Sequence, residues 1–178
     1  MKLHLGCGPR HIPGYYHVDI GDFPHVDLRH GIDRIPMMAD SSADVIYVCH
    51  ALEHFHRRET QRVLREWLRI LRPGGTLRVA VPDFEAICEV YAQRRNLDLV
   101  IGPLFGRQDY LWNVHYTVFD FRALERDLAA VGFTRVRRYD WRHTDHASVD
   151  DYSRSYIPHM DFAHGKLISL NVEADKPE

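Results

Sequence analysis

The stretch Leu3-His-Leu-Gly-Cys-Gly-Pro9 decides how the rest of the chain is interpreted. A short apolar segment, Leu3–Leu5, has the length of a strand and runs directly into two glycines separated by one residue. In open α/β sheets such a loop lies at the carboxyl edge, where ligands bind, and glycine lets the backbone approach a ligand closely. The pattern therefore predicts a ligand site built on Gly6 and Gly8.

The residues after the glycines disfavour one common class of ligand. A dinucleotide-binding loop has a third glycine and opens a helix whose N-terminus holds a pyrophosphate. Here His11 stands where that glycine would be, and Pro9 and Pro13 leave room for one helical turn at most. The sequence therefore predicts a shortened first helix and disfavours NAD and NADP. A ligand held by its ribose and adenine remains compatible with the loop.

Two acidic residues follow the next predicted strands. Asp19 ends a strand over Tyr15–Asp19, eleven residues beyond Gly8, and its carboxylate could accept hydrogen bonds from both hydroxyls of a ribose. Asp27 lies in a third predicted strand, Val26–Leu28, and could accept a hydrogen bond from an adenine amine. Each acid alone is a weak signal, but the ordered set of glycine loop and two acids indicates a nucleoside site.

The remaining apolar patterns predict strands that alternate with helices. The expected strands are 44–49, 76–81, 133–139 and 166–174, and the expected helices are Thr60–Leu71, one capped by Asp83 and one capped by Asp120 and closed by Gly132. The helix after Asp83 is expected to bury the face formed by Phe84, Ile87, Cys88 and Tyr91. This alternation predicts a Rossmann-like, doubly wound α/β fold: a mostly parallel sheet with helices on both faces.

Length and composition bound the class of protein. The 178 residues, 45% of them hydrophobic, fit a single domain over 1–178 with a core of its own. A formal net charge of −2 gives no case for a general nucleic-acid or membrane-surface binder. No apolar run is long enough to span a membrane, and Met1–His4 lacks the apolar core of a signal peptide, so we expect a cytoplasmic protein. The three cysteines show no CxxC spacing, which argues against a disulfide framework.

The segment His50-Ala-Leu-Glu-His54 is open to three interpretations. It matches the HxxEH motif of one class of zinc hydrolases, but it abuts a buried strand and has no evident downstream glutamate ligand. In the second interpretation Glu53, His54 and His56, together with His115, hold a divalent ion that binds a substrate hydroxyl. In the third, which needs no metal and which we adopt here, Glu53 and His54 hydrogen-bond the backbone of the loop.

Several segments together resemble the small class I S-adenosylmethionine-dependent methyltransferases. They are Leu3–Pro9, Val18-Asp19, Asp40–Tyr47, His50–Phe55 and Leu71–Leu77. The chain resembles most closely the short predicted methyltransferases found among polysaccharide and lipopolysaccharide biosynthesis proteins, and its ending Ser169–Ala174 is similar to theirs. The resemblance covers roughly residues 2–140 and 166–176.

The resemblance implies S-adenosylmethionine as the cofactor and suggests which residues hold it. The methionine end would lie against Gly6, Cys7 and Gly8, the ribose against Asp19, the adenine against Asp27 and Leu28, and the sulfonium methyl near His50. The sequence departs from the broad family at His4, because an acid often stands two residues before the first glycine. The carboxylate contact behind the methionine amino group is therefore absent.

The resemblance also implies methyl transfer, and we favour the hydroxyl of a sugar or glycan as the acceptor. A neutral hydroxyl is a weak nucleophile that gains about 10²–10⁴-fold from a general base, and histidine suits this role near neutral pH. His115 is the expected base, with His50 and His54 as the other catalytic candidates. The polar segments 96–117 and 141–165 are expected to form a substrate lid. The alternative is a binding protein with this fold that no longer turns over.

Overall fold

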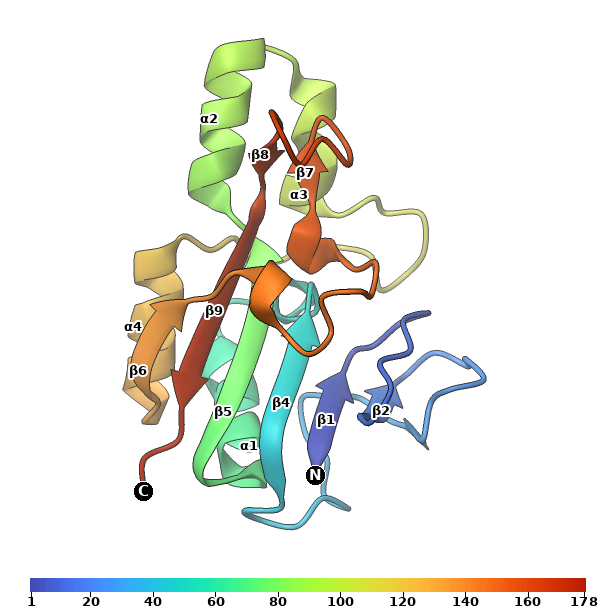
Figure 1. The fold of residues 1–178 in the computed structure, drawn as a ribbon, viewed down its shortest axis with the longest axis vertical. Coiled ribbons are helices and arrows are strands. Elements are labelled where there is room, and N and C mark those ends of the chain that lie inside the picture. The colour runs from blue at the N-terminus through green and yellow to red at the C-terminus, as the bar shows by residue number, and fades with distance from the viewer.

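A computed structural model describes residues 1–178 as a seven-stranded sheet with helices packed on it (Figure 1). The strand order is β3-β2-β1-β4-β5-β9-β6. Five parallel strands come first in the sequence: β1 (Lys2–Leu5), β2 (Tyr16–Asp19), β3 (Leu28–Arg29), β4 (Ala43–Cys49) and β5 (Leu71–Pro82). The last strand, β9 (Ser169–Asp175), inserts antiparallel between β5 and β6 (Thr134–Arg138). The mostly parallel sheet is as predicted.

Three of the four helices begin where the sequence signals them, whereas the short helix over Ile101–Phe105 was not predicted. They are α1 (Thr60–Ile70), α2 (Phe84–Arg94), α3 (Ile101–Phe105) and α4 (Phe121–Val131). The carboxylates of Asp83 and Asp120 accept hydrogen bonds from backbone N–H groups in the first turns of α2 and α4, and Gly132 closes α4 with φ +111°. The chain also forms four short 3-10 helices: η1 (Leu52–His54), η2 (Leu97–Leu99), η3 (Trp141–His143) and η4 (Tyr152–Arg154). None of the helices combines the length and the apolar character needed to cross a bilayer.

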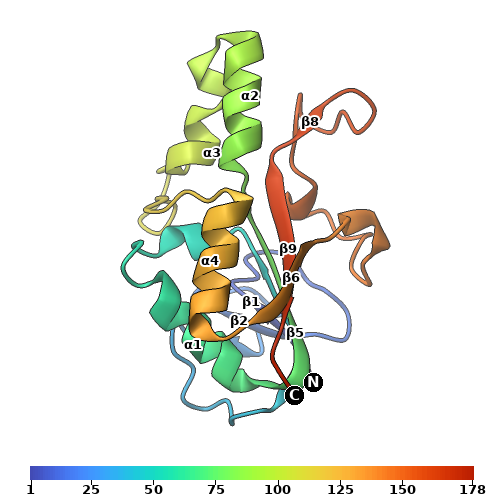
Figure 2. The same cartoon turned by 90° about the vertical axis from the view of Figure 1, so that its left-hand side faces the viewer.

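The main core lies on one face of the sheet, beneath α1 and α4 (Figure 2). Leu3 and Leu5 of β1 point into it, as do Ile46 and Val48 of β4, because alternate residues of a strand face the same side. Trp67 of α1 is fully buried there and donates its indole N–H to the carbonyl of Ile32 at 2.8 Å. This packing fixes the position of β1 relative to β4 along the strand direction. It therefore also fixes where the loops that follow these two strands lie.

The opposite face is covered by irregular chain, so the expectation of helices on both faces is wrong for this side. Residues 141–156, with η3 and η4, lie over it: His146 packs on the ring of Tyr47 with centroids 3.9 Å apart, and the Tyr47 hydroxyl donates to Asp151 at 2.6 Å. Helices on this face would have to come from the connections 6–15 and 20–27. These connections are shorter than the dozen or so residues that a helical crossover takes, and the first contains two prolines.

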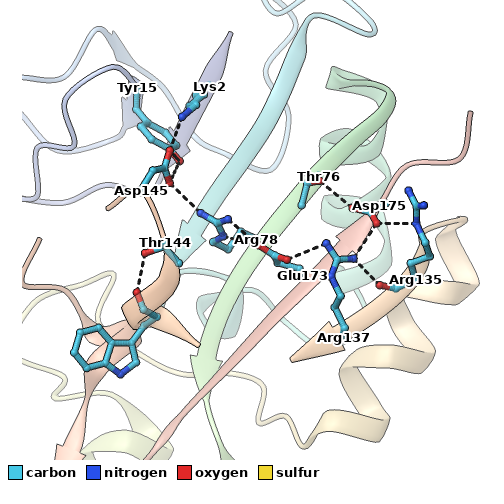
Figure 3. A network of polar contacts seen from close by, with 11 residues as sticks. Lys2, Tyr15, Thr76, Arg78, Arg135, Arg137, Thr144, Asp145, Glu173 and Asp175 are labelled. Carbon is cyan, nitrogen blue, oxygen red and sulfur yellow. Dashed lines mark hydrogen bonds and ion pairs between the residues drawn. The ribbon is translucent and has the colours of Figure 1, made fainter. Parts of the chain in front are cut away.

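An ionic network ties this covering segment to the sheet (Figure 3). Asp145 pairs with Lys2 of β1 and, at 3.1 Å, with Arg78 of β5. Arg78 continues to Glu173 of β9 at 2.8 Å, and Glu173 to Arg137 of β6 at 2.9 Å. The network takes side chains from four strands, β1, β5, β9 and β6, so it joins the covering segment to the centre and edge of the sheet.

Two local expectations are corrected by the packing. The third strand is Leu28–Arg29, so Asp27 lies in the turn before it. The buried residues of α2 are Ala86, Ile87 and Val90, whereas Phe84 and Tyr91 are 40% and 42% exposed.

The position of α2 explains the second correction. This helix projects beyond the sheet and packs on Val100 and Ile168, not on the main core (Figure 1). The last predicted strand is also divided: β8 (Lys166–Leu167) pairs with β7 (Tyr156–Ile157), and β9 begins at Ser169.

Candidate active site

The glycine loop follows β1 and lies directly beside the end of β4. Gly6 and Gly8 have φ values of +65° and +52°, which side-chain-bearing residues rarely adopt. A Cβ on Gly6 would lie 2.8 Å from the Cβ of Ala51, so no side chain fits there, whereas a Cβ on Gly8 would meet open space. No helix stands between β1 and β2, so the predicted shortening of the first helix is complete. A helix N-terminus for a pyrophosphate is therefore missing.

Asp19 fastens the glycine loop to the end of β2. Its buried carboxylate accepts hydrogen bonds from the backbone N–H of Gly8 at 2.8 Å and from that of Gly21 at 2.6 Å. Each carboxylate oxygen keeps a second lone pair. Gly21 was missed in the sequence, where a glycine two residues past an acid looks like an ordinary turn residue.

The other predicted cofactor residues lie around the same edge. The Asp27 carboxylate accepts from the backbone N–H of His17 at 2.7 Å, which ties the β2–β3 connection to β2. Leu28 is half-buried against the main core. Cys7 is buried, and burial, with Asp19 as a second cause, raises the pKa of its thiol to about 12. Cys7 is therefore a neutral lining residue and not a nucleophile.

Beyond β4 the chain brings together a carboxyl group and three imidazoles. Glu53, in η1, is completely buried. Its Oε1 lies 3.4 Å from His50 Nδ1 and 4.0 Å from His115 Nε2. The rings of His54 and His115 have centroids 4.9 Å apart. The structure thus unites all three predicted catalytic histidines.

Hydrogen bonds between two distant segments account for the position of His115. The backbone N–H of Tyr116 donates to the Glu53 carbonyl at 2.9 Å, and the His54 Nδ1–H donates to the Val114 carbonyl at 3.0 Å. Residues 114–116 are therefore pinned against η1. The expected hydrogen bond of His54 to the loop backbone is present, but the one expected for Glu53 is wrong, because neither of its carboxyl oxygens has a hydrogen-bond partner. His56, by contrast, is exposed and packs on the ring of Tyr116, outside the group.

His50 is held in an unusual conformation by partners that the sequence did not reveal. Its φ is +50°, its backbone N–H donates to the Ala80 carbonyl at 2.8 Å, and its Nε2 lies 3.0 Å from the Ser169 hydroxyl. Ser169 in turn donates to Asn171 Oδ1 at 2.9 Å. The segment Ser169–Asn171 of β9 belongs to the ending that supports the resemblance, but its contact with His50 arises only from the antiparallel insertion of β9.

Burial sets the protonation of this cluster. It raises the pKa of Glu53 to about 8 and, together with the neighbouring histidines, lowers the pKa of His50 to about 3 and that of His115 to about 4. The imidazoles are therefore neutral at pH 7. They offer lone pairs, not positive charge, to whatever enters the site.

Each predicted lid segment brings a side chain to the site. The ring centroid of Tyr152, in η4, lies 5.4 Å from that of His50. His115, from the first segment, has its Nε2 4.0 Å from Glu53 Oε1. Both lid segments thus reach the cluster at the end of β4.

Comparisons with known proteins agree on the class of fold. The structure is similar over 98–99% of its length to methyltransferases from Thermotoga maritima and Archaeoglobus fulgidus and to the 1,6-didemethyltoxoflavin N1-methyltransferase of Burkholderia thailandensis, which was solved with S-adenosylhomocysteine. The TM-score is 0.59 in each case, the identities are 16%, 14% and 14%, and the shares of those chains that are covered are 81%, 85% and 71%. The fold is the class I methyltransferase fold.

Sequence comparisons point to the same class. A methyltransferase-domain family matches residues 22–79, which include the segment His50–His54 but not the glycine loop. A probable S-adenosylmethionine-dependent methyltransferase of Mycolicibacterium smegmatis is 36% identical over 62 residues, which are 34% of this chain and 23% of that protein. The chain thus spans about a quarter of the length of this curated relative.

The chain thus has the class I methyltransferase fold, and one segment is similar in sequence to methyltransferases that use S-adenosylmethionine. The residues at the edge of the sheet fit this cofactor. Gly6 lets the loop pass directly beside Ala51, Gly8 faces open space, and Asp19 retains lone pairs beside the loop.

Proposed function

We propose that this protein transfers the methyl group of S-adenosylmethionine to a hydroxyl of a sugar or glycan. The observation that carries the proposal is the cluster of His50, Glu53, His54 and His115 at the end of β4, next to the glycine loop. A polar, buried cluster at this place faces the position of the reacting methyl group in the proposed site. Imidazole lone pairs there suit an acceptor that must lose a proton.

Each cofactor residue has a proposed part in binding. Gly6, Cys7 and Gly8 line the methionine end, Asp19 accepts hydrogen bonds from the ribose hydroxyls, and Asp27 with Leu28 borders the adenine. S-adenosylmethionine, when bound, supplies an electrophilic methyl group on its sulfonium. The chain's main contribution is alignment of the acceptor with that methyl group, an effect worth up to about 7–11 kcal/mol.

The acceptor hydroxyl is activated by the cluster, and we expect this activation to depend most on His115. Its Nδ1–H donates to the Pro103 carbonyl at 2.9 Å, so its Nε2 carries a lone pair directed toward the cluster. The corresponding hydrogen bond of His54 goes to the neighbouring loop at Val114, and His50 is held by Ser169. His50 shapes the cofactor side of the pocket.

We also propose that residues 96–117 and 141–165 cover the bound substrate. Tyr152, from the second segment, borders the site and provides a flat aromatic surface of the kind on which sugars pack. The segment 141–156 is partly anchored on the sheet through Asp151 and His146. Residues 157–165 are the more exposed part of the second segment.

The zinc-hydrolase interpretation of the HxxEH motif has no support in the geometry. His50 directly follows β4 with a left-handed backbone, and Glu53 and His54 lie in the separate turn η1, so the motif does not share one helix. The alternative of a binding protein without turnover predicts cofactor binding and no product.

One experiment separates these functions. The protein is incubated with S-adenosylmethionine carrying a deuterated methyl group and with a panel of nucleotide sugars and oligosaccharides, and the acceptors are analysed by mass spectrometry. With the parent protein we expect the labelled methyl group on a sugar oxygen. When the Gly8→Val variant replaces the parent protein, we expect no labelled acceptor. Label on nitrogen or carbon would contradict the proposed acceptor, and cofactor binding without label on any acceptor would favour the binding protein.

A further inference from the structure

The carboxyl group of Glu53 is buried without a hydrogen-bond partner. Both of its oxygens are inaccessible, and neither accepts a hydrogen bond from any group of the chain. Buried polar groups are almost always paired, and leaving one unpaired costs roughly 1–3 kcal/mol, more for a charged group. An orphaned carboxyl group at the centre of a candidate active site therefore indicates a missing partner.

The groups that face Glu53 cannot supply this partner in their neutral form. The Nδ1 atoms of His54 and His115 lie 3.0 and 2.9 Å from backbone carbonyl oxygens, which can only accept, so both Nδ1 atoms carry the hydrogen. Their Nε2 atoms therefore hold lone pairs.

His50 presents a lone pair to Glu53 as well. The Ser169 hydroxyl gives its hydrogen to Asn171, whose amide nitrogen is occupied at Ser153, so Ser169 accepts from His50 Nε2–H. The Nδ1 atom of His50, which lies 3.4 Å from Glu53 Oε1, is then unprotonated and carries a lone pair. Several electron-pair donors thus converge on one buried carboxyl group, where either the carboxyl proton or a bound cation can balance them.

We propose that Glu53, His54 and His115 bind a divalent transition-metal ion, and that this ion orients and activates the acceptor hydroxyl. This inference rests on the proposed function and specifies how the cluster serves it. His115 then acts as a metal ligand in place of a free base. The set differs from the one considered in the sequence, since His56 is not part of it.

The donor atoms satisfy the requirements of such a site. One carboxylate oxygen and the two imidazole nitrogens all lie within 4.8 Å of one another. Ligands about 2.0–2.2 Å from one tetrahedral ion lie about 3.3–3.6 Å apart, so the side chains must close by up to about 1.5 Å when the ion binds. Both histidines donate their other ring N–H to a backbone carbonyl, as metal-bound histidines commonly do. Two nitrogens and one oxygen favour Zn²⁺, Fe²⁺, Co²⁺ or Mn²⁺ over Mg²⁺ or Ca²⁺, which prefer all-oxygen sites.

Three protein ligands leave coordination positions for an acceptor. A hydroxyl bound there has a lowered pKa and releases its proton to solvent. Its oxygen electron pair forms the new bond to the methyl carbon as the carbon–sulfur bond breaks, and that electron pair stays on the sulfur. The products are a methyl ether, S-adenosylhomocysteine and one proton.

The test measures metal binding, independently of methyl transfer. The full-length protein is freed of metal with a chelator and titrated with Zn²⁺, Mn²⁺ and Mg²⁺ by calorimetry, and with Co²⁺ by visible absorption. We expect one Zn²⁺ and one Co²⁺ per chain, a cobalt spectrum typical of nitrogen ligands, and much weaker binding of Mg²⁺. Failure of the parent protein to bind any of these ions stoichiometrically would overturn the proposal.

Variants locate the site. Glu53→Gln and His115→Ala should each weaken Zn²⁺ binding by about 100-fold or more, whereas His56→Ala, which removes a nearby exposed histidine, should leave it unchanged. Should Glu53→Gln not fold, His115→Ala and the cobalt spectrum decide. Zinc binding that survives His115→Ala, or that is lost in His56→Ala, would also overturn the proposal.

The metal site and the proposed function can fail separately. S-adenosylmethionine binding, measured by calorimetry with metal-free protein, tests the cofactor site without the ion. A bound ion of the expected stoichiometry with no methylated sugar would contradict the proposed acceptor and uphold the metal site. Sugar methylation that persists at full rate in a chelator would uphold the proposed function and overturn the role of the ion.

Discussion

The backbone N–H of Gly8 donates a hydrogen bond to the Asp19 carboxylate at 2.8 Å, and this bond joins the loops that follow β1 and β2. Because Gly21 donates to the other carboxylate oxygen, one side chain sets the shape of both loops. Asp19, which we propose binds the ribose, thus also organises the glycine loop before any cofactor binds. Preorganisation of this kind lowers the entropy lost on binding.

The glycine loop provides the first prediction. Gly8→Val should abolish measurable binding of S-adenosylmethionine and S-adenosylhomocysteine in calorimetry, because valine would fill the open space beside Asp19 and strain a backbone at φ +52°. Gly14→Val is the matched control, since Gly14 also has a positive φ of +82° and open space around it. Equal cofactor binding by parent and Gly8→Val would contradict the site assignment.

The second prediction concerns His115. His115→Ala should lower kcat by about 10²-fold or more while the affinity for S-adenosylmethionine stays nearly unchanged, because the side chain acts on the acceptor in the transition state and does not bind the cofactor. Steady-state kinetics on the methylated acceptor, with calorimetry for the cofactor, measures the two effects separately. His56→Ala serves as the control and should keep the parental kcat. A loss of cofactor affinity equal to the loss of rate would place His115 in the cofactor pocket instead.

The third prediction concerns pH and the covered face of the sheet. His4 is buried among His17, Tyr15 and Tyr47, and burial lowers its pKa from 6.5 to about 3, with His17 as the next cause. The unfolded chain therefore binds more protons between pH 6.5 and 3, and the free energy of unfolding falls as the pH falls through this window. From pH 7.5 to 5.5 this one group should reduce stability by about 1.4 kcal/mol.

Urea unfolding of the parent and of His4→Leu at the two pH values measures this contribution. Leucine carries no titratable group, so the variant should lose less stability on acidification by about the amount assigned to His4. An identical pH dependence in both proteins would show that His4 has the same pKa in the folded and the unfolded chain, contrary to its burial.

The fourth prediction concerns the ionic network of Figure 3. Glu173→Gln should lower the free energy of unfolding by about 1–3 kcal/mol, because the mostly buried carboxylate lies between Arg78 at 2.8 Å and Arg137 at 2.9 Å. Asp22→Asn breaks the exposed pair with Arg29 and should change stability by less than about 0.5 kcal/mol. Urea unfolding at neutral pH compares them. A loss in Glu173→Gln no larger than that in Asp22→Asn would show that solvent screens the network.

Local signals in the sequence determined the elements of this fold. The apolar run of β4, the caps at Asp83 and Asp120 and the glycine that closes α4 were readable because each depends on near neighbours in the chain. The glycine loop and Asp19 were readable for a related reason: parallel strands must end at the same edge, so residues just past them meet. The order of motifs therefore indicated both the class of fold and the cofactor edge.

Long-range packing decided what the sequence could not. The short connections of the first three strands could not form helices, so the second face of the sheet was left to residues 141–156, more than a hundred positions later. His115 joins Glu53 only because residues 114–116 hydrogen-bond to η1, and His50 meets Ser169 only because β9 inserts beside β5. Such contacts depend on where distant segments are placed by the burial of apolar surface. That placement is a property of the whole chain and leaves no local pattern of residues to read.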